Sequence, residues 1–138
     1  MKQGREIKIT ILIVEDHEQT VAAMQSLLSR AFPDCELLVA GSAERALELC
    51  EIKAPQVVVM DIVLPGMDGM KATRQIKTRL PATFVVVHSS HDIEIYREES
   101  ASAGASAFVA KTRTFSDLVP TISGLLSSSR AARIEGNG

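Results

Sequence analysis

Short runs of apolar residues alternate along this chain with longer stretches in which apolar residues recur every three or four positions. Such runs are typical of strands that are buried on both faces of a parallel sheet. Five of them lie at 7–14, 37–40, 57–60, 84–87 and 107–110. A stretch of helical periodicity follows each run, so the pattern predicts right-handed βαβ units in an α/β domain.

The helical stretches differ in how well their apolar faces are filled. The first, over 21–31, has a regular apolar face, and Ser42 is suited to be the N-cap of the second. The third follows the turn residues 65–69. The fourth, from about 91 to 103, is rich in Ser, Ala and Glu, and Gly104 is its expected C-cap. We expect few apolar contacts to hold this fourth helix in place.

The start of the last helix is ambiguous. Thr114 and Asp117 have the spacing of a capping box, which would make Thr114 the N-cap. Pro120 would then lie inside the helix, where its ring clashes with the carbonyl of Ser116. The sequence leaves two alternatives: the helix kinks at Pro120, or it begins later, near Ser116 or Asp117.

Polar residues stand at the ends of four of the five predicted strands. Glu15 and Asp16 follow the first, Asp61 the third, Ser89 the fourth and Lys111 the fifth. The carboxyl ends of parallel strands meet at one edge of the sheet, and ligands bind there in such folds. Because Asp61 follows four apolar residues and precedes a loop with Pro-Gly and Asp-Gly turns, we interpret it as the residue that the domain presents for chemistry.

The residue types at this edge favour phosphoryl chemistry. Three carboxylates in one pocket repel each other unless a cation is bound, and Mg²⁺ prefers oxygen ligands of this kind. A carboxylate beside the cation can act as a nucleophile and form an aspartyl-phosphate. Lys111 would supply a fixed positive charge, and Ser89 would offer a hydroxyl donor to a phosphoryl oxygen. The expected cofactor is therefore Mg²⁺.

Composition narrows the class of protein. The 138 residues are 46% hydrophobic and 23% charged, which fits one domain with a substantial core. The net charge is −2, and no basic block favours binding to nucleic acid or to a membrane surface. No stretch resembles a signal peptide or approaches the ~20 apolar residues of a membrane span, so a cytoplasmic location is expected. Cys35 and Cys50 lie in apolar patterns, and we interpret them as small core residues rather than a disulfide or a metal pair.

Four segments, at 12–17, 58–69, 85–92 and 104–111, together resemble the receiver domains of two-component response regulators. The loop Asp-x-x-Leu-Pro-Gly-Met-Asp-Gly, the helix start Lys-Ala-Thr-Arg and the run Ser-x-His-Asp are most similar to the NarL/FixJ-type subfamily. The resemblance covers nearly the whole chain. It implies a CheY-like (βα)5 flavodoxin-like fold, with a doubly wound five-stranded parallel sheet in the order 2-1-3-4-5.

The resemblance also implies roles for the residues at the sheet edge. Asp61 would be the phospho-acceptor, and Lys111 would bind the phosphoryl group. Glu15 and Asp16 would bind Mg²⁺ directly or through water. The backbone carbonyl of Val63 would be a further ligand, and Asp61 itself would complete the metal site.

Two further residues stand at positions that switch in this family. Phosphorylation would draw Ser89 inward, and Phe108 would fill the space that Ser89 leaves. The implied function is a signalling switch, phosphorylated by a partner histidine kinase or phosphotransfer protein. The surface of the fourth helix, fifth strand and fifth helix would then control an output, transcription foremost. Such a domain catalyses only its own phosphorylation and dephosphorylation.

Three positions depart from the common pattern of the family. Glu15 stands where Asp is commoner, and it keeps the charge. Thr112 follows Lys111 where many receivers have a cis-proline, which leaves the geometry of that peptide open. His88 precedes Ser89 where an apolar residue is usual. We interpret it as a satisfied or partly exposed histidine, with a pH- or partner-sensing role as the alternative.

The expected organisation is a disordered extension at 1–6, a receiver domain at 7–126, and a flexible tail or the start of a linker at 127–138. NarL/FixJ-type regulators usually carry a helix-turn-helix DNA-binding domain after the linker. DNA contact would need such an output domain, so the chain is either a stand-alone receiver or part of a longer regulator. A homodimer on activation is a further expectation.

Two other functions stay open at this point. One is a pseudo-receiver, a binding module that is not phosphorylated. The other is a phosphatase with an aspartyl-phosphate intermediate, as in haloacid-dehalogenase-like hydrolases. Those enzymes place an acid–base Asp two residues after the nucleophile, where Val63 cannot transfer a proton. His17 and His91, at loop edges, are interpreted as local hydrogen-bonding residues rather than metal ligands.

Overall fold

The computed structural model describes residues 8–91 and 94–137, with side chains described up to Ser129. Strands and helices alternate in the order that the hydrophobic pattern predicts. They are β1 Thr10–Val14, α1 Glu18–Ala31, β2 Glu36–Ala40, α2 Ala43–Lys53, β3 Val57–Met60, α3 Gly69–Arg79, β4 Phe84–Ser89, α4 Glu94–Ser102, β5 Ala107–Ala110, a 3₁₀ turn at Lys111–Arg113, and α5 Thr114–Asn137.

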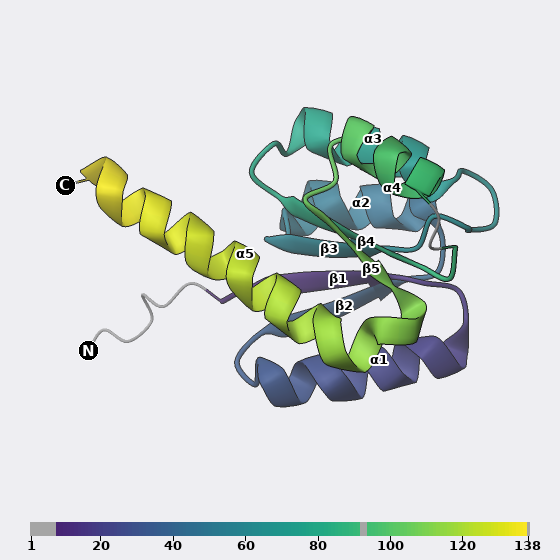
Figure 1. Ribbon diagram of the computed structural model, residues 1–138, viewed down its shortest axis with the longest axis horizontal. Helices are drawn as coiled ribbons and strands as arrows, with labels where there is room; N and C mark the ends of the chain where they lie inside the picture. Colours follow the sequence, from purple (N-terminus) through teal and green to yellow (C-terminus); the bar gives the residue numbers. More distant parts are fainter. Residues whose placement is uncertain (1–7, 92–93, 138) are drawn as a thin grey trace.

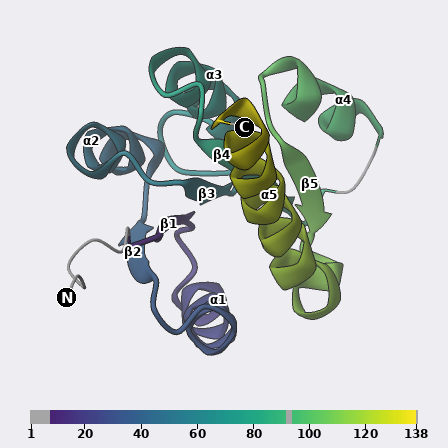
Figure 2. The same ribbon diagram turned by 90° about the vertical axis from the view of Figure 1, so that its left-hand side faces the viewer.

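All strands are parallel, and their order in the sheet is β2-β1-β3-β4-β5. Helices α2, α3 and α4 cover one face, and α1 and α5 cover the other (Figure 1; Figure 2 turns the molecule by 90°). The predicted doubly wound α/β fold is confirmed. In the register, Val14 lies beside Met60 and Ser89 beside Ala110, so the carboxyl ends of the inner strands reach one edge together.

The apolar runs are continuous because both faces of the sheet are buried. Within β1, Leu12 and Val14 pack in the core under α2 and α3, whereas Ile11 and Ile13 pack in the core under α1 and α5. Each of these four side chains is at most 1% exposed. A strand with one wet face would instead alternate apolar and polar residues.

Side-chain caps fix the starts of α2 and α3. The Ser42 hydroxyl accepts a hydrogen bond from the Arg45 N–H at 3.1 Å, which confirms the predicted N-cap. The Asp68 carboxylate accepts from the Lys71 N–H at 2.8 Å, so α3 begins at Gly69, directly after the loop that carries Asp61. These caps satisfy backbone donors that have no partner within the helix.

The last helix contains Pro120, as the first of the two alternatives required, and it does not begin later, near Ser116 or Asp117. It begins at Thr114, which has helical dihedral angles and lies inside the helix, and it continues through Pro120 to Asn137. The capping-box interpretation is wrong, because Asp117 pairs with Arg113 at 2.7 Å and the Thr114 hydroxyl donates to the Lys111 carbonyl. Pro120 is on an exposed face, so water can reach the Ser116 carbonyl that lacks a helical partner.

The carboxyl-terminal half of α5 extends beyond the edge of the sheet (Figure 1). The backbone is helical at 127–137, where the polar composition had favoured a tail. Whether these residues start a linker stays a prediction, as does the domain boundary at 126. The expected disordered extension at 1–6 lies outside the described residues.

Several smaller expectations are also settled. Cys35 and Cys50 are both free, and Cys50 is buried. The Lys111–Thr112 peptide is trans. Gly104 has a φ of +101°, as expected for the residue that ends α4. No helix in the described part of the chain is long and apolar enough to cross a membrane.

Candidate functional site

The ends of β1 and β3 bring the predicted acidic residues together. The Asp61 N–H donates to the Val14 carbonyl at 3.1 Å and the Glu15 N–H to the Ala40 carbonyl at 3.0 Å, so the sheet ladder continues into both acidic residues. Glu15 is 2% exposed and Asp61 3%. One ligand atom each from Glu15, Asp16, His17 and Asp61 lies within 4.8 Å of the others.

Lys111 joins this cluster from the end of β5. Its Nζ lies 2.8 Å from Glu15 Oε1 and 3.1 Å from Asp61 Oδ2. The second contact is a hydrogen bond that the ammonium group donates. Four of the predicted site residues, Glu15, Asp16, Asp61 and Lys111, therefore form one constellation.

Burial and pairing set the charges of these groups. Burial raises the pKa of Asp61 above its ordinary value, and hydrogen bonds from the Val63 N–H and Lys111 only partly offset this. Burial acts in the same direction on Glu15, but there the hydrogen bonds from Lys111 and His17 prevail and lower its pKa. The two carboxylates raise the pKa of Lys111 despite its desolvation. The ammonium group thus stays charged beside them.

The donor set fits a hard divalent cation. Glu15 Oε1 is buried, and its partner in the described part of the chain is the Lys111 ammonium group, 2.8 Å away. Glu15, Asp16 and Asp61 each place a carboxylate oxygen in the cluster. Carboxylate oxygens with room for water are the ligands that Mg²⁺ prefers. Glu15, Asp16 and Asp61 would hold the ion, and the Val63 carbonyl stays a predicted ligand.

Sequence reasoning did not identify two residues of this site. Gly69 packs so closely against the Asp61 carbonyl oxygen that a Cβ there would overlap it, which explains the glycine in the Asp-Gly turn. His17 Nδ1 lies 2.9 Å from Glu15 Oε2 and 3.5 Å from Asp16 Oδ1. Its pairing with Glu15 raises its pKa, so it is a local hydrogen-bonding residue, as expected, but one within the cluster.

Neither of the two predicted switch residues forms a described hydrogen bond with the acidic cluster. Ser89 is fully buried at the end of β4, and its hydroxyl accepts from the His91 N–H at 2.9 Å. Phe108 is half-buried on β5, with the Arg97 guanidinium carbon 4.5 Å from its ring centroid. Their roles in switching stay predictions.

His88 is a satisfied core residue, as one of the two expectations had it. It is 1% exposed, and its Nε2 lies 2.7 Å from the Thr114 hydroxyl oxygen. Burial, and secondarily the positive charge of Lys111, lower its pKa to about 4. His88 is therefore neutral at physiological pH.

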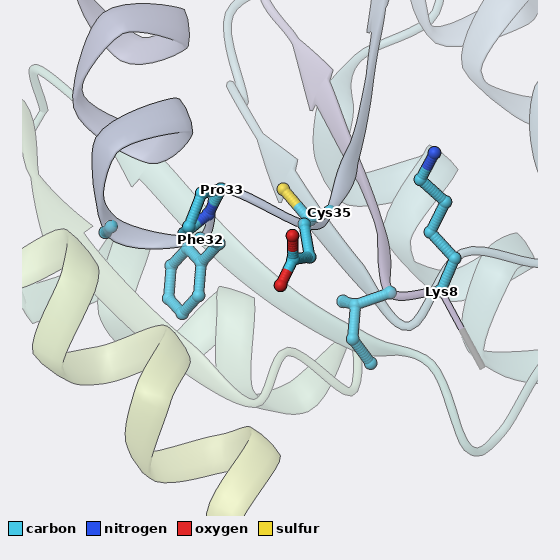
Figure 3. Close-up of a pocket in the computed structure, with 7 residues that line it drawn as sticks. Lys8, Phe32, Pro33 and Cys35 are labelled. Carbon is cyan, nitrogen blue, oxygen red and sulfur yellow. The ribbon is translucent and has the colours of Figure 1, made fainter. Parts of the chain in front are cut away.

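A pocket of about 650 Å³ lies at the opposite, amino-terminal end of the strands. It is lined by Lys8, Phe32, Pro33 and Cys35, among others, and the Lys8 side chain points away from the Cys35 thiol (Figure 3). Burial raises the pKa of Cys35, which makes this thiol a poor nucleophile. The chemistry-bearing residues are therefore at the carboxyl edge and not in this pocket.

Comparison with known proteins adds an independent finding. The family profile of the response regulator receiver domain matches residues 11–123. The chain is 34% identical over 122 residues to the transcriptional regulatory protein DegU of Brevibacillus brevis, covering 88% of this chain and 51% of that protein. It is 33% identical over 117 residues to the response regulator protein VraR of Staphylococcus saprophyticus, covering 83% and 54%. The chain spans about half the length of these curated relatives.

Solved structures agree with this. A DNA-binding response regulator of the LuxR family from Staphylococcus aureus superimposes with a TM-score of 0.78 at 28% identity, over 85% of this chain and 98% of that chain. A CheY-like receiver domain protein from Methanospirillum hungatei gives 0.84 at 23% identity, over 91% and 99%, and supports the fold alone.

Proposed function

The chain belongs to the response regulator receiver domain family, and from this premise we propose that it is the phospho-accepting switch of a two-component system. Asp61 would be the acceptor. The observation that carries the proposal is the single constellation of Glu15, Asp61 and Lys111, in which one ammonium group bridges two buried carboxylates.

The geometry supports a direct transfer to Asp61. One of its carboxylate oxygens attacks the phosphorus, the bond from phosphorus to the nitrogen of the donor histidine breaks, and the imidazole leaves with the electron pair. The Val63 N–H holds Oδ1 at 3.0 Å, so the carboxylate is oriented before the reaction. The Lys111 ammonium group would stabilise the negative charge that the phosphoryl group carries. Mg²⁺, when bound, would neutralise further charge on the phosphoryl oxygens.

The response to phosphorylation is part of the proposal. Ser89 would turn towards the phosphoryl group, Phe108 would occupy the vacated space, and the surface of α4, β5 and α5 would change shape. A histidine kinase or phosphotransfer protein would be the donor. DegU is a transcriptional regulatory protein by name, so we propose transcription as the output, through a DNA-binding domain beyond these residues. Dimerisation on activation is the matching expectation for the assembly.

The test is phosphorylation by acetyl phosphate with Mg²⁺, followed by intact mass spectrometry. The wild-type chain should gain one phosphate, and Asp61→Asn should gain none. Asp68→Asn is the matched control, because asparagine can still cap α3 and this carboxylate is not in the cluster. An adduct that persists in Asp61→Asn would refute the assignment of the acceptor.

Two further outcomes bear on the alternatives. Absence of any adduct on the wild type would favour the binding module that is not phosphorylated. Sedimentation with and without beryllofluoride tests the assembly. A chain that stays monomeric in both conditions would refute the proposed dimerisation and would not affect the assignment of Asp61 as the phospho-acceptor.

A further inference from the structure

We propose that His88 is a positioning residue for Lys111 and acts through the hydroxyl of Thr114. The inference rests on the proposed function, in which Lys111 serves the phosphoryl group. His88 lies on β4 beside Val109 of β5, and Lys111 follows two residues after Val109. The His88 ring reaches past β5 to the first residue of α5, where it meets Thr114.

The directions of the two hydrogen bonds follow from the number of protons. The Thr114 hydroxyl oxygen lies 2.7 Å from His88 Nε2 and 2.9 Å from the Lys111 carbonyl oxygen. A carbonyl can only accept, so the hydroxyl proton goes to Lys111. The hydrogen bond between the ring and the hydroxyl oxygen then needs a proton on the ring nitrogen, so His88 Nε2–H donates to the Thr114 oxygen. The result is a chain of two donors that ends on the backbone of Lys111.

This chain fixes the turn from which the Lys111 side chain departs. The Lys111 carbonyl also accepts the backbone N–H of Thr114, which closes the 3₁₀ turn. Two donors from one residue therefore hold the carbonyl of the lysine whose Nζ must reach both Glu15 and Asp61. A small rotation of this turn would move the ammonium group by a larger amount, because the side chain is long.

Packing beside the turn is incomplete on the side that faces α1. A crevice of about 260 Å³ between α1 and α5 is lined by Met24, His88, Thr114 and Lys111, among others. The side chains of α1 leave space beside the turn, so we expect the hydrogen bonds to contribute to holding it. His88 itself is 1% exposed, so its ring cannot turn away to water.

The test separates positioning from stability by comparing Thr114→Val with Thr114→Ser. Valine has nearly the same shape as threonine but no hydroxyl, and serine keeps the hydroxyl. The probe is Mg²⁺ itself, titrated into the unphosphorylated chain by NMR or calorimetry. A Lys111 that is less firmly held neutralises the carboxylates less, so Thr114→Val should tighten the Mg²⁺ Kd about threefold. Thr114→Ser should stay within the error of the wild type.

A second measurement uses the acetyl phosphate rate at saturating Mg²⁺. Thr114→Val should react roughly fivefold more slowly, because displacement of a catalytic group by a fraction of an ångström has effects of this size. The double variant His88→Leu/Thr114→Val removes both polar partners and should regain the urea midpoint that Thr114→Val alone loses. It should not regain the rate, which is the outcome that a purely structural role would not give.

The proposal is overturned if Thr114→Val and Thr114→Ser have the same Mg²⁺ Kd, or if the double variant recovers rate together with stability. A wild-type chain that acetyl phosphate does not modify would refute the proposed function instead. The Mg²⁺ comparison would still test the Thr114 hydroxyl, through which His88 acts, since it needs no phosphorylation.

Discussion

Helices α1 and α4 pack against the molecule in opposite ways. α1 buries Met24 and Leu28 completely in the core below β1 and β3. In α4, the described residue that is buried is Ser100, whereas Ile95 is 56% exposed. The expectation that few apolar contacts hold the fourth helix is therefore confirmed.

The difference separates a firmly packed part of the domain from a loosely packed part. The strands that carry Glu15 and Asp61 are anchored between two apolar layers, so the acidic edge keeps its geometry. Because α4 buries little apolar surface, its displacement costs much less free energy. The proposed switch would need both properties, since the site must be ready before phosphorylation and the surface must change after it.

The largest expected effect is on the firmly packed part. Leu28→Ala should lower the free energy of unfolding by about 2–5 kcal/mol, because it leaves a cavity in a closed core. Ile95→Ala, also in a helix, should change it by less than about 0.5 kcal/mol. Urea denaturation of both variants measures the contrast. Equal losses would mean that α4 is as firmly packed as α1.

The next effect is on how stability depends on pH, because the firmly packed part of the domain contains His88, whose buried ring disfavours protonation. Burial lowers the pKa of His88 to about 4, so the unfolded chain binds a proton between pH 6.5 and 4 that the folded chain does not. The contribution of His88 is therefore complete above pH 6.5 and is lost as the pH falls to about 4. The loss should approach about 3 kcal/mol, since a tenfold change in proton affinity is worth about 1.4 kcal/mol.

His88→Gln is the control for this pH dependence. Glutamine can still donate to the Thr114 hydroxyl, but it does not titrate. Urea unfolding at several pH values should show a difference between wild type and variant that grows below pH 6.5 and levels off near pH 4. Parallel curves for the two proteins would contradict the buried, neutral state of His88.

A smaller effect is expected where α3 meets the acidic edge. Gly69→Ala places a Cβ against the Asp61 carbonyl oxygen, which is backbone and cannot turn aside. We expect a loss of roughly 1–3 kcal/mol, as for overpacking in a core. Gly41→Ala is the matched control, because a Cβ there meets nothing within 4 Å. If the two variants are equally stable, the loop after Asp61 is more adaptable than its contacts indicate.

The pattern of apolar residues was enough to predict the sheet and its acidic edge. Strands such as Val57–Met60 are buried on both faces, so their sequence is a continuous apolar run that is easy to recognise. Because the strands are parallel, the polar residues at their carboxyl ends lie at the same edge of the sheet. The family resemblance added the strand order and the expected roles.

The sequence could not provide features that depend on contacts between distant segments. The start of α5 is one, since Thr114 turns its hydroxyl to Lys111 and His88 instead of capping the helix. The close approach of Gly69 to Asp61 is another: an Asp-Gly pair predicts a turn but not what lies against it. His17 belongs to the cluster for the same reason.

The smallest expected effect tests what holds α4. The Arg97 guanidinium lies over the Phe108 ring, so part of the attachment of α4 to β5 is a cation–π contact instead of apolar burial. Arg97→Gln should cost about 0.5–1 kcal/mol and speed amide exchange in α4. Phe108→Leu, which removes the ring face, should cost a similar amount, and the double variant should cost less than the sum of the two. Arg113→Gln breaks an exposed pair with Asp117 on α5 and should leave exchange in α4 unchanged. Additive losses, or faster exchange throughout the sheet, would show that this contact does not link α4 to the strand that carries Phe108.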